Sequence, residues 1–346
     1  MVDESTTGMD ADADRDTGDG VAEELESRVG WRYTLSQVKR DPTALAGLFI
    51  IAVMVLVAAI AFVDSIVFDV LSEVQFLADM GVRPYWFAET FWVNPNVDPN
   101  SAQILRPPVG LTNQLYPNEP GTWANPLGTD HRGRDILVRL FYGTRIAITV
   151  GIVSTGIAMA LGMLVGSVAG YYGGWIDDAL MRGSETLYAI PFLVLVIAFM
   201  TAFGRNLTYA MVGVGIATIP TFARLIRSRV LSVREEDYVE AARAAGVRDR
   251  NIILRHVIPN SFAPVLVQAT LQVGVNILII AGLSFLGYGA QPPTASWGQM
   301  LANSRQYMLP NAWFSIWPGI AILVTVVGFN LIGDGLRDAL DPRINN

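Results

Sequence analysis

The chain of 346 residues contains no cysteine. A disulfide framework and a thiolate metal site are therefore both excluded. The only two imidazole side chains, His131 and His256, lie far apart in the sequence. We therefore expect no metal site and no cofactor, and we expect that the chain does not act through thiol or metal catalysis.

Lysine is almost absent as well. Lys39 is the only lysine and it follows Val38, whereas a P-loop needs a Gly-Lys pair to hold nucleotide phosphates. The chain therefore lacks the nucleotide-binding loop of an ATP-driven motor. If the protein uses ATP, the ATPase must be another polypeptide.

The net charge of -7 comes from the first residues of the chain. Residues 1–27 hold ten Asp or Glu and a single basic residue, Arg15. Segments of low hydrophobicity and high charge do not bury enough apolar surface to fold. We expect residues 1–30 to be a disordered acidic tail, and its lack of an apolar core argues against a cleaved signal peptide.

Most of the remaining chain is apolar, and hydrophobic residues make up 52% of the total. An uncharged apolar run of about 20 residues has the length that crosses a bilayer as a helix. The runs lie at Ala44 to Val63, Ile146 to Ala169, Thr186 to Phe203, Leu207 to Ala223, Pro264 to Phe285 and Ala312 to Ile332. The sequence thus predicts an all-α integral membrane protein with six transmembrane helices.

One charged segment, residues 235–260, lies between the fourth and fifth apolar runs. Ser232 and Glu235 have capping-box spacing, and Gly246 supplies the positive φ that ends a helix. A second helix is expected from Asp249 to Val257, with Pro259 as its stop. This pattern predicts two short helices on a polar loop.

The first of these helices has many small side chains. Tyr238, Ala241, Ala242 and Ala245 are predicted to share one face, on which alanines allow close approach to a partner. Glu240 and Arg243 supply charges that would orient the docked helix. The alternative is an amphipathic helix that faces only solvent.

The segment resembles the EAA loop of ABC-importer permeases, the element that inserts into a groove of the ATPase subunit. Glu240, Ala241, Ala242, Gly246 and Pro259 stand at the spacing of that motif. His256 and Ile258 depart mildly from it, since the general pattern prefers Ile and Leu there. The resemblance assigns the ATPase-coupling role to residues 232–260.

Four further blocks resemble the C-type subunit of the dipeptide, oligopeptide and nickel importer permeases. They are PLGTDHRGRDILVRLFYGTR from Pro126, GYYGGWIDD from Gly170, SFLGYGAQPPTASW from Ser284 and NLIGDGLRDALDPR from Asn330. The resemblance implies the fold of a type I ABC importer permease. Its implied cargo is a peptide or a similar small solute, with nickel as a further possibility, carried by alternating access.

The same resemblance implies the partners. These are a homologous B-type permease, two cytoplasmic ATP-binding subunits and an extracytoplasmic substrate-binding protein, all acting at the lipid bilayer of the plasma membrane. We expect no nucleic-acid partner. ATP hydrolysis would then belong to the partner chains, and selectivity to the binding protein.

Basic residues near the membrane ends predict the orientation. The loop between the fourth and fifth runs carries eight arginines from Arg224 to Arg255, which favours its placement inside the cell. Both termini are then cytoplasmic. The expected order is a first segment at 31–63, an external loop at 64–130, a permease core at 131–335 and a C-terminal tail at 336–346. The long external loop either contacts the binding protein or forms an ordered cap.

Polar and small residues mark two faces inside the predicted membrane helices. Gln268, Gln272 and Asn276 share a face of the fifth run, where they either line the substrate path or bond to a neighbouring helix. Small residues recur every four positions of the second run and predict close helix packing. They are Ser154, Ala158, Gly162, Gly166 and Gly170.

Two other classes of protein fit less well. A secondary transporter is expected to hold ionisable residues within the membrane, and the six runs contain no Asp, Glu, Lys or Arg. A membrane enzyme needs a nucleophile with a base, a carboxylate pair or a metal cluster, and none is recognisable. The importer permease therefore remains the preferred interpretation.

Overall fold

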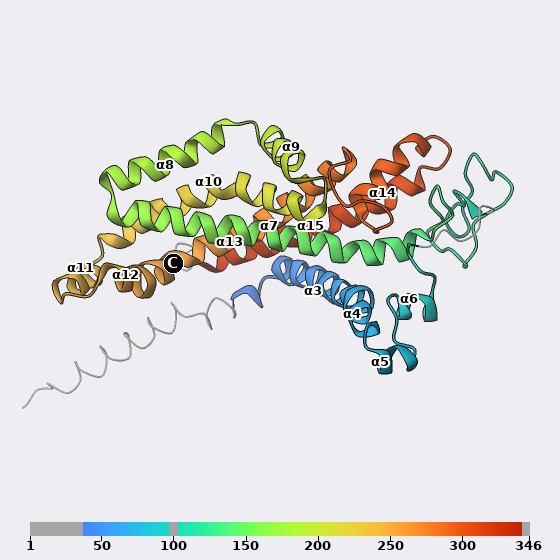
Figure 1. Cartoon of the computed structure of the whole chain (residues 1–346), viewed down its shortest axis with the longest axis horizontal. Coiled ribbons are helices and arrows are strands. Elements are labelled where there is room, and N and C mark those ends of the chain that lie inside the picture. Colours follow the sequence, from blue (N-terminus) through green and yellow to red (C-terminus); the bar gives the residue numbers. More distant parts are fainter. Residues whose placement is uncertain (1–36, 97–102, 341–346) are drawn as a thin grey trace, which may run out of the picture.

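The computed structural model describes residues 37–96 and 103–340 (Figure 1). Within these ranges the regular structure is helical, apart from two isolated β-bridges. Long helices run side by side along the molecule, with α11 and α12 at one end and α14 at the other. The expected acidic tail at 1–30 lies outside the described residues.

Five elements within these ranges are long and apolar enough to cross a membrane, and the bent pair α8 and α9 makes a sixth if it counts as one span. This confirms the predicted fold class. The five comprise α3 (Pro42–Phe62) with its extension to Ser72, α7 (Ile136–Tyr172), α10 (Leu207–Arg234), α13 (Ile258–Phe285) with the turns before it, and α15 (Trp313–Leu340). α15 thus continues past the expected boundary at residue 335.

The third predicted span is not one straight helix. The chain forms α8 (Gly174–Ala189) and α9 (Phe192–Phe203), which meet at an angle of 91°. Ile190 is extended, with ψ of 129°, and Pro191 follows it. A proline disfavours the helical conformation of the residue before it, so the break falls at this pair. Pro220 and Pro318, by contrast, lie inside α10 and α15 without ending them.

The small-residue face of α7 packs against α10. A methyl group added at Gly162 would collide with Phe222, and one added at Gly170 would lie 3.0 Å from the backbone oxygen of Arg227. The absence of side chains at these positions lets the two helix backbones approach closely. The prediction of close packing is confirmed, and the partner is a helix of the same chain.

Short elements cover the end of the bundle at which α7 begins. α3 continues through a π turn (Val63–Val67) and α4 (Phe68–Ser72), past the expected boundary at 63, and α5 (Gln75–Asp79) and α6 (Trp86–Phe91) follow. The buried Asp64 carboxylate accepts hydrogen bonds from the backbone N–H groups of Phe87 and Ala88 and from the Tyr142 hydroxyl. A buried carboxylate needs hydrogen-bond donors around it. These bonds therefore hold the cap, which consists of residues 64–96 and 103–135, against α7.

A second group of contacts joins this cap to the start of α7. The buried Asp130 carboxylate accepts from Arg134 Nε at 2.8 Å and lies 3.7 Å from Arg139 Nε. Arg139 also donates to the carbonyl of Pro95 at 2.6 Å. On the other side, the indole N–H of Trp297 in α14 (Trp297–Ser304) donates to the Leu140 carbonyl. The alternation of acid and arginine in this block is therefore a structural network, a role that the sequence pattern did not reveal.

Candidate functional site

The predicted coupling loop lies at the opposite end of the molecule from this cap (Figure 1). Its first helix is α11 (Asp237–Ala244), which follows the last residue of α10 after a short break. The predicted capping box at Ser232 and Glu235 is wrong, because α10 continues to Arg234 and Ser232 donates to the carbonyl of Ser228 instead.

The turn after α11 is the one that the sequence predicts. Gly246 has φ of 77°, its N–H donates to the Arg243 carbonyl, and the Val247 N–H donates to the Ala242 carbonyl. These two bonds are those of a Schellman motif, which satisfies the free carbonyls at a helix end. Gly246 therefore reverses the chain toward the second helix.

The predicted stop at Pro259 is wrong. α12 (Asp249–Ile252) leads through a π turn (Ile253–Val257) directly into α13, and the three form one continuous element of 37 residues. In the π turn the N–H of Ile258 donates to the Ile253 carbonyl. Pro259 follows directly after this turn, so it lies inside the continuous element, where the shifted hydrogen bonds of the π turn accommodate its missing N–H. The second half of the loop is thus an extension of a membrane helix.

Apolar contacts hold the loop against the bundle. Val239 and Ile252 are fully buried, and both belong to one cluster with Phe222 and Val230 of α10 and with Tyr171 of α7. Burial of this kind stabilises the loop by roughly 25 cal/mol per Å² of apolar surface removed from water. The loop is therefore a packed part of the fold.

The faces of α11 differ from the prediction at one position. Ala242 packs against the apolar cluster, whereas Tyr238, Ala241 and Ala245 are exposed together with Glu240. The outward face therefore presents small side chains, one aromatic ring and charge, which suits close contact with another protein. Desolvation and the nearby Glu236 carboxylate raise the pKa of Tyr238 above its ordinary value.

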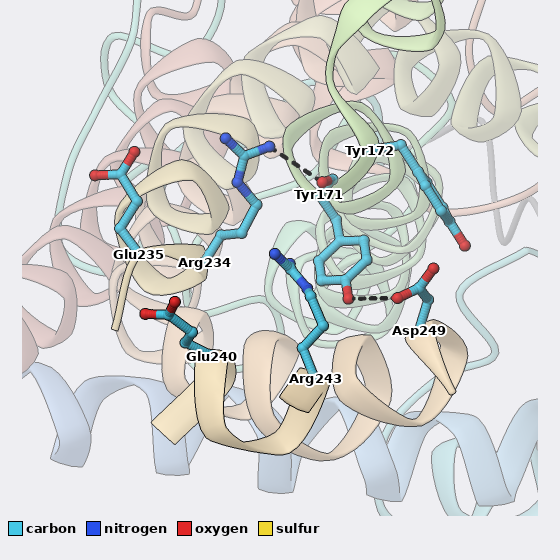
Figure 2. A pocket seen from close by; sticks show the side chains of 7 residues that line it. All are labelled: Tyr171, Tyr172, Arg234, Glu235, Glu240, Arg243 and Asp249. Atoms are coloured by element: carbon cyan, nitrogen blue, oxygen red, sulfur yellow. Dashed lines mark hydrogen bonds between the residues drawn. The ribbon is translucent and has the colours of Figure 1, made fainter. Parts of the chain in front are cut away.

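A hollow of about 650 Å³ lies between α11 and the end of α7 (Figure 2). Tyr171, which points into it, donates its hydroxyl proton to Asp249 Oδ1 at 2.7 Å, and the Arg243 guanidinium lies 5.5 Å from the Tyr171 ring centroid. Arg234 donates to the carbonyls of Gly170 and Tyr171 at 3.3 and 3.2 Å. The remaining lining residues are Tyr172, Glu235 and Glu240. The sequence pattern singled out GYYGGWIDD as a block but gave Tyr171 no role.

The three amides of α13 do not all occupy the same environment. Asn276 is fully buried and donates to the Thr155 hydroxyl of α7 at 3.0 Å, and Gln272 donates to Asn276 Oδ1 at 3.1 Å. Gln268 is half-buried and makes no hydrogen bond to a described residue. For Asn276 the geometry favours an interhelical contact over a path-lining role.

Comparison with known proteins places the chain among transport permeases. Residues 162–346 match the model of the family described as "Binding-protein-dependent transport system inner membrane component". A dipeptide transport system permease of Alkalihalophilus pseudofirmus is 38% identical over 316 residues, which cover 91% of each chain. A glutathione transport system permease of Pectobacterium atrosepticum is 43% identical over 66% of this chain and 76% of its own length.

One more permease is similar to much of the chain. A probable D,D-dipeptide transport system permease of Escherichia coli K12 is 42% identical over 71% of this chain and 79% of its own length. Among solved structures, the MetNI methionine ABC transporter in an inward-facing conformation matches with a TM-score of 0.49 and 22% identity over 59% of this chain and 97% of its own. The family match and the first relative cover enough of the chain to assign it. The protein belongs to the binding-protein-dependent transport system inner membrane components, the permease subunits of ABC importers.

Proposed function

We propose that the chain forms half of a membrane pore for a small peptide or a peptide-like solute, together with a homologous B-type permease. The relatives described above carry dipeptide, D,D-dipeptide and glutathione names. A peptide-like cargo is therefore proposed ahead of a nickel complex. An extracytoplasmic binding protein would select that cargo and deliver it.

The drive for transport would come from two cytoplasmic ATP-binding subunits. The observation that carries this proposal is the outward face of α11, on which Glu240, Ala241 and Ala245 are exposed while Val239 anchors the helix beneath. A rigidly seated helix with a small-residue face can fill a groove of a partner and transmit its movement. Arg243 and Gly246 would orient and end this helix, and Pro259 would lie where the continuous second helix passes from the loop into the membrane span.

The orientation follows from the same proposal. If α11 and α12 face the cytoplasm, the arginine-rich end of α10 does so too, in agreement with the distribution of basic residues. The cap built by residues 64–96 and 103–135 would then face outward, where the binding protein docks. Both chain ends would be cytoplasmic.

Purification of the tagged chain in mild detergent tests the assembly. We expect a P-loop ATPase, a second permease and, with added binding protein, a ligand-loaded complex to co-purify. Mass spectrometry of the ligand released from the binding protein would identify the cargo. Purified membranes in which this chain alone accumulated solute, with no ATPase present, would overturn the proposal.

Charge reversal at α11 tests the coupling role. Glu240→Arg should lower ATP-driven uptake at least about tenfold, the effect of losing a few kcal/mol at a desolvated contact. The side chain is exposed, so the thermal stability of the isolated chain should not change. Glu73→Arg reverses another exposed carboxylate at the opposite end of the molecule. Co-purification of the ATPase, measured on both variants, should fall for Glu240→Arg and stay unchanged for Glu73→Arg.

A further inference from the structure

The end of α7 and the start of α12 are joined by a polar contact that the apolar packing does not require. Tyr171 lies in the last turn of α7, and its hydroxyl donates to Asp249 Oδ1 at 2.7 Å. Asp249 is the first residue of α12. Arg243 of α11 lies over the same tyrosine ring. One side chain of α7 therefore contacts both helices of the coupling loop (Figure 2).

The surrounding backbone fixes the position of this tyrosine. Gly170 lets α10 approach α7 closely, which brings Arg234 onto the carbonyls of Gly170 and Tyr171. Those carbonyls have no partner within the helix, and a cation at a helix C-terminus is favourable. Gly173, with φ of 67°, then turns the chain away into α8. The last turn of α7 is thus positioned by the close approach of α10, by the hydrogen bonds from Arg234 and by the turn at Gly173.

The two partners of the hydrogen bond differ in exposure. Tyr171 is only 5% exposed, with its ring in the apolar cluster, whereas Asp249 is exposed to solvent. If the hydroxyl were removed, water could solvate the carboxylate, so the folded state would lose little. A hydrogen bond that contributes little to folding yet fixes the distance between two elements is suited to transmitting movement between them.

We propose that Tyr171 is a positioning residue that fixes the α11 and α12 loop to the end of α7, so that displacement of the docked loop moves α7 with it. This inference rests on the proposed function of α11. The apolar contacts beneath the loop are non-directional and permit sliding, whereas the hydrogen bond to Asp249 has a preferred length and angle. Without that bond the loop would still dock and would still move α13, with which α12 is continuous, but part of its movement would not reach α7.

The test uses the complete transporter in proteoliposomes, with its ATPase subunits and binding protein and with a radiolabelled dipeptide as the probe. The variants are Tyr171→Phe, Asp249→Asn and the double variant. The control is Tyr172→Phe, whose hydroxyl makes no hydrogen bond to a described residue. Uptake and ATP hydrolysis are measured on the same vesicles, so that the number of solute molecules carried per ATP is obtained directly.

We expect Tyr171→Phe to lower the solute carried per ATP about fivefold, the factor associated with one lost hydrogen bond. ATPase co-purification and the melting temperature should stay at the wild-type level. The double variant should be no worse than Tyr171→Phe, because both changes break the same bond. Tyr172→Phe should match the wild type.

Three results would overturn the inference. One is an unchanged ratio of solute to ATP in Tyr171→Phe, and another is a loss of ATPase binding in parallel with uptake, which would make Tyr171 part of the docking surface. The third is a double variant whose loss is the product of the two single losses. The proposed function fails separately, if the wild-type chain neither binds an ATPase nor requires ATP.

Discussion

At the scale of single residues, the backbone angle of Gly246 determines how α11 ends. Its φ of 77° lies in the left-handed region, and a Cβ at this position would meet no atom within 4 Å. Any penalty of substitution is therefore backbone strain alone. We expect Gly246→Val to misplace α11 and reduce ATPase co-purification, because a β-branched side chain in this region costs about 1–2 kcal/mol.

Gly246→Asn is the matched control, since asparagine tolerates the left-handed region far better. It should retain most ATPase binding. Equal binding by the wild type and by Gly246→Val would show that the turn does not set the position of α11.

Asn276 provides a residue-scale test of the two hypotheses for the amide face. Asn276→Leu removes the bonds to Thr155 and Gln272 and should lower the free energy of unfolding in detergent by about 1 kcal/mol, a typical value for a polar contact within a membrane. Gln268→Leu, which breaks no such bond, should leave stability unchanged. A loss of uptake without a loss of stability in either variant would instead favour the path-lining role.

Asp135 makes the stability of the N-terminal end of α7 dependent on pH. It is the N-cap of α7, its side chain accepts from the Val138 N–H, and burial raises its pKa to about 6 from 3.8. The pKa of Asp135 is higher in the folded state than in the unfolded state, so the protonated carboxyl stabilises the fold. This contribution is complete below about pH 4 and is lost as the pH rises through about 6. Ionised Asp135 therefore weakens the fold at neutral pH.

Asp135→Asn retains a capping acceptor but has no charge to bury. We expect its melting temperature to exceed that of the wild type by more at pH 7.5 than at pH 4. Thermal unfolding of both purified proteins across this range is the measurement. A difference that does not vary with pH would contradict the assignment.

At the scale of elements, an ion pair and a cation–π contact of Arg224 with the Tyr188 ring join α8 to α10. Arg227 donates Nε and Nη2 to the two carboxylate oxygens of Asp177 at 2.6 and 2.5 Å. This bidentate geometry is the stronger form of the pair, although partial exposure limits its contribution to about 1 kcal/mol. Asp177→Asn should speed hydrogen exchange in residues 174–189 about fivefold, whereas Asp178→Asn, on the next residue, should not.

The membrane helices could be predicted from the sequence because each depends on a local property, an uncharged apolar run of spanning length. Gly246 was predictable for the same reason, since the need for positive φ is local. The 91° angle between α8 and α9 was not. A proline indicates where a helix can break, but the direction of the next helix depends on what packs against it.

The errors in the coupling loop share a physical cause. Pro259 was expected to stop a helix, yet a π turn upstream shifts the hydrogen-bond pattern so that the helix continues. Periodicity shows which residues share a side of a helix, but not which side turns toward the apolar cluster. It therefore predicts Ala242 on the outward face, whereas Ala242 packs against that cluster. Tyr171 and Asp249 are 78 positions apart, and no local pattern links them.

At the scale of the whole molecule, the absence of cysteine permits a direct test of orientation. Thr122→Cys and Ser232→Cys each introduce one thiol at an exposed position, in the cap and at the end of α10 that leads into the coupling loop. A membrane-impermeant maleimide should label the first in intact cells and the second only in inverted vesicles. The reverse pattern would contradict the proposed cytoplasmic termini.

The continuity of α12, the π turn and α13 has a mechanical consequence. An element of 37 residues is about 55 Å long, so a tilt of about 5° about its midpoint shifts each tip by about 2 Å. The two ends of the helix then move in opposite directions. If the coupling loop faces the cell interior and α13 borders the pore, as proposed, a push on the loop would narrow one mouth of the pore and widen the other, which is the geometry that alternating access demands.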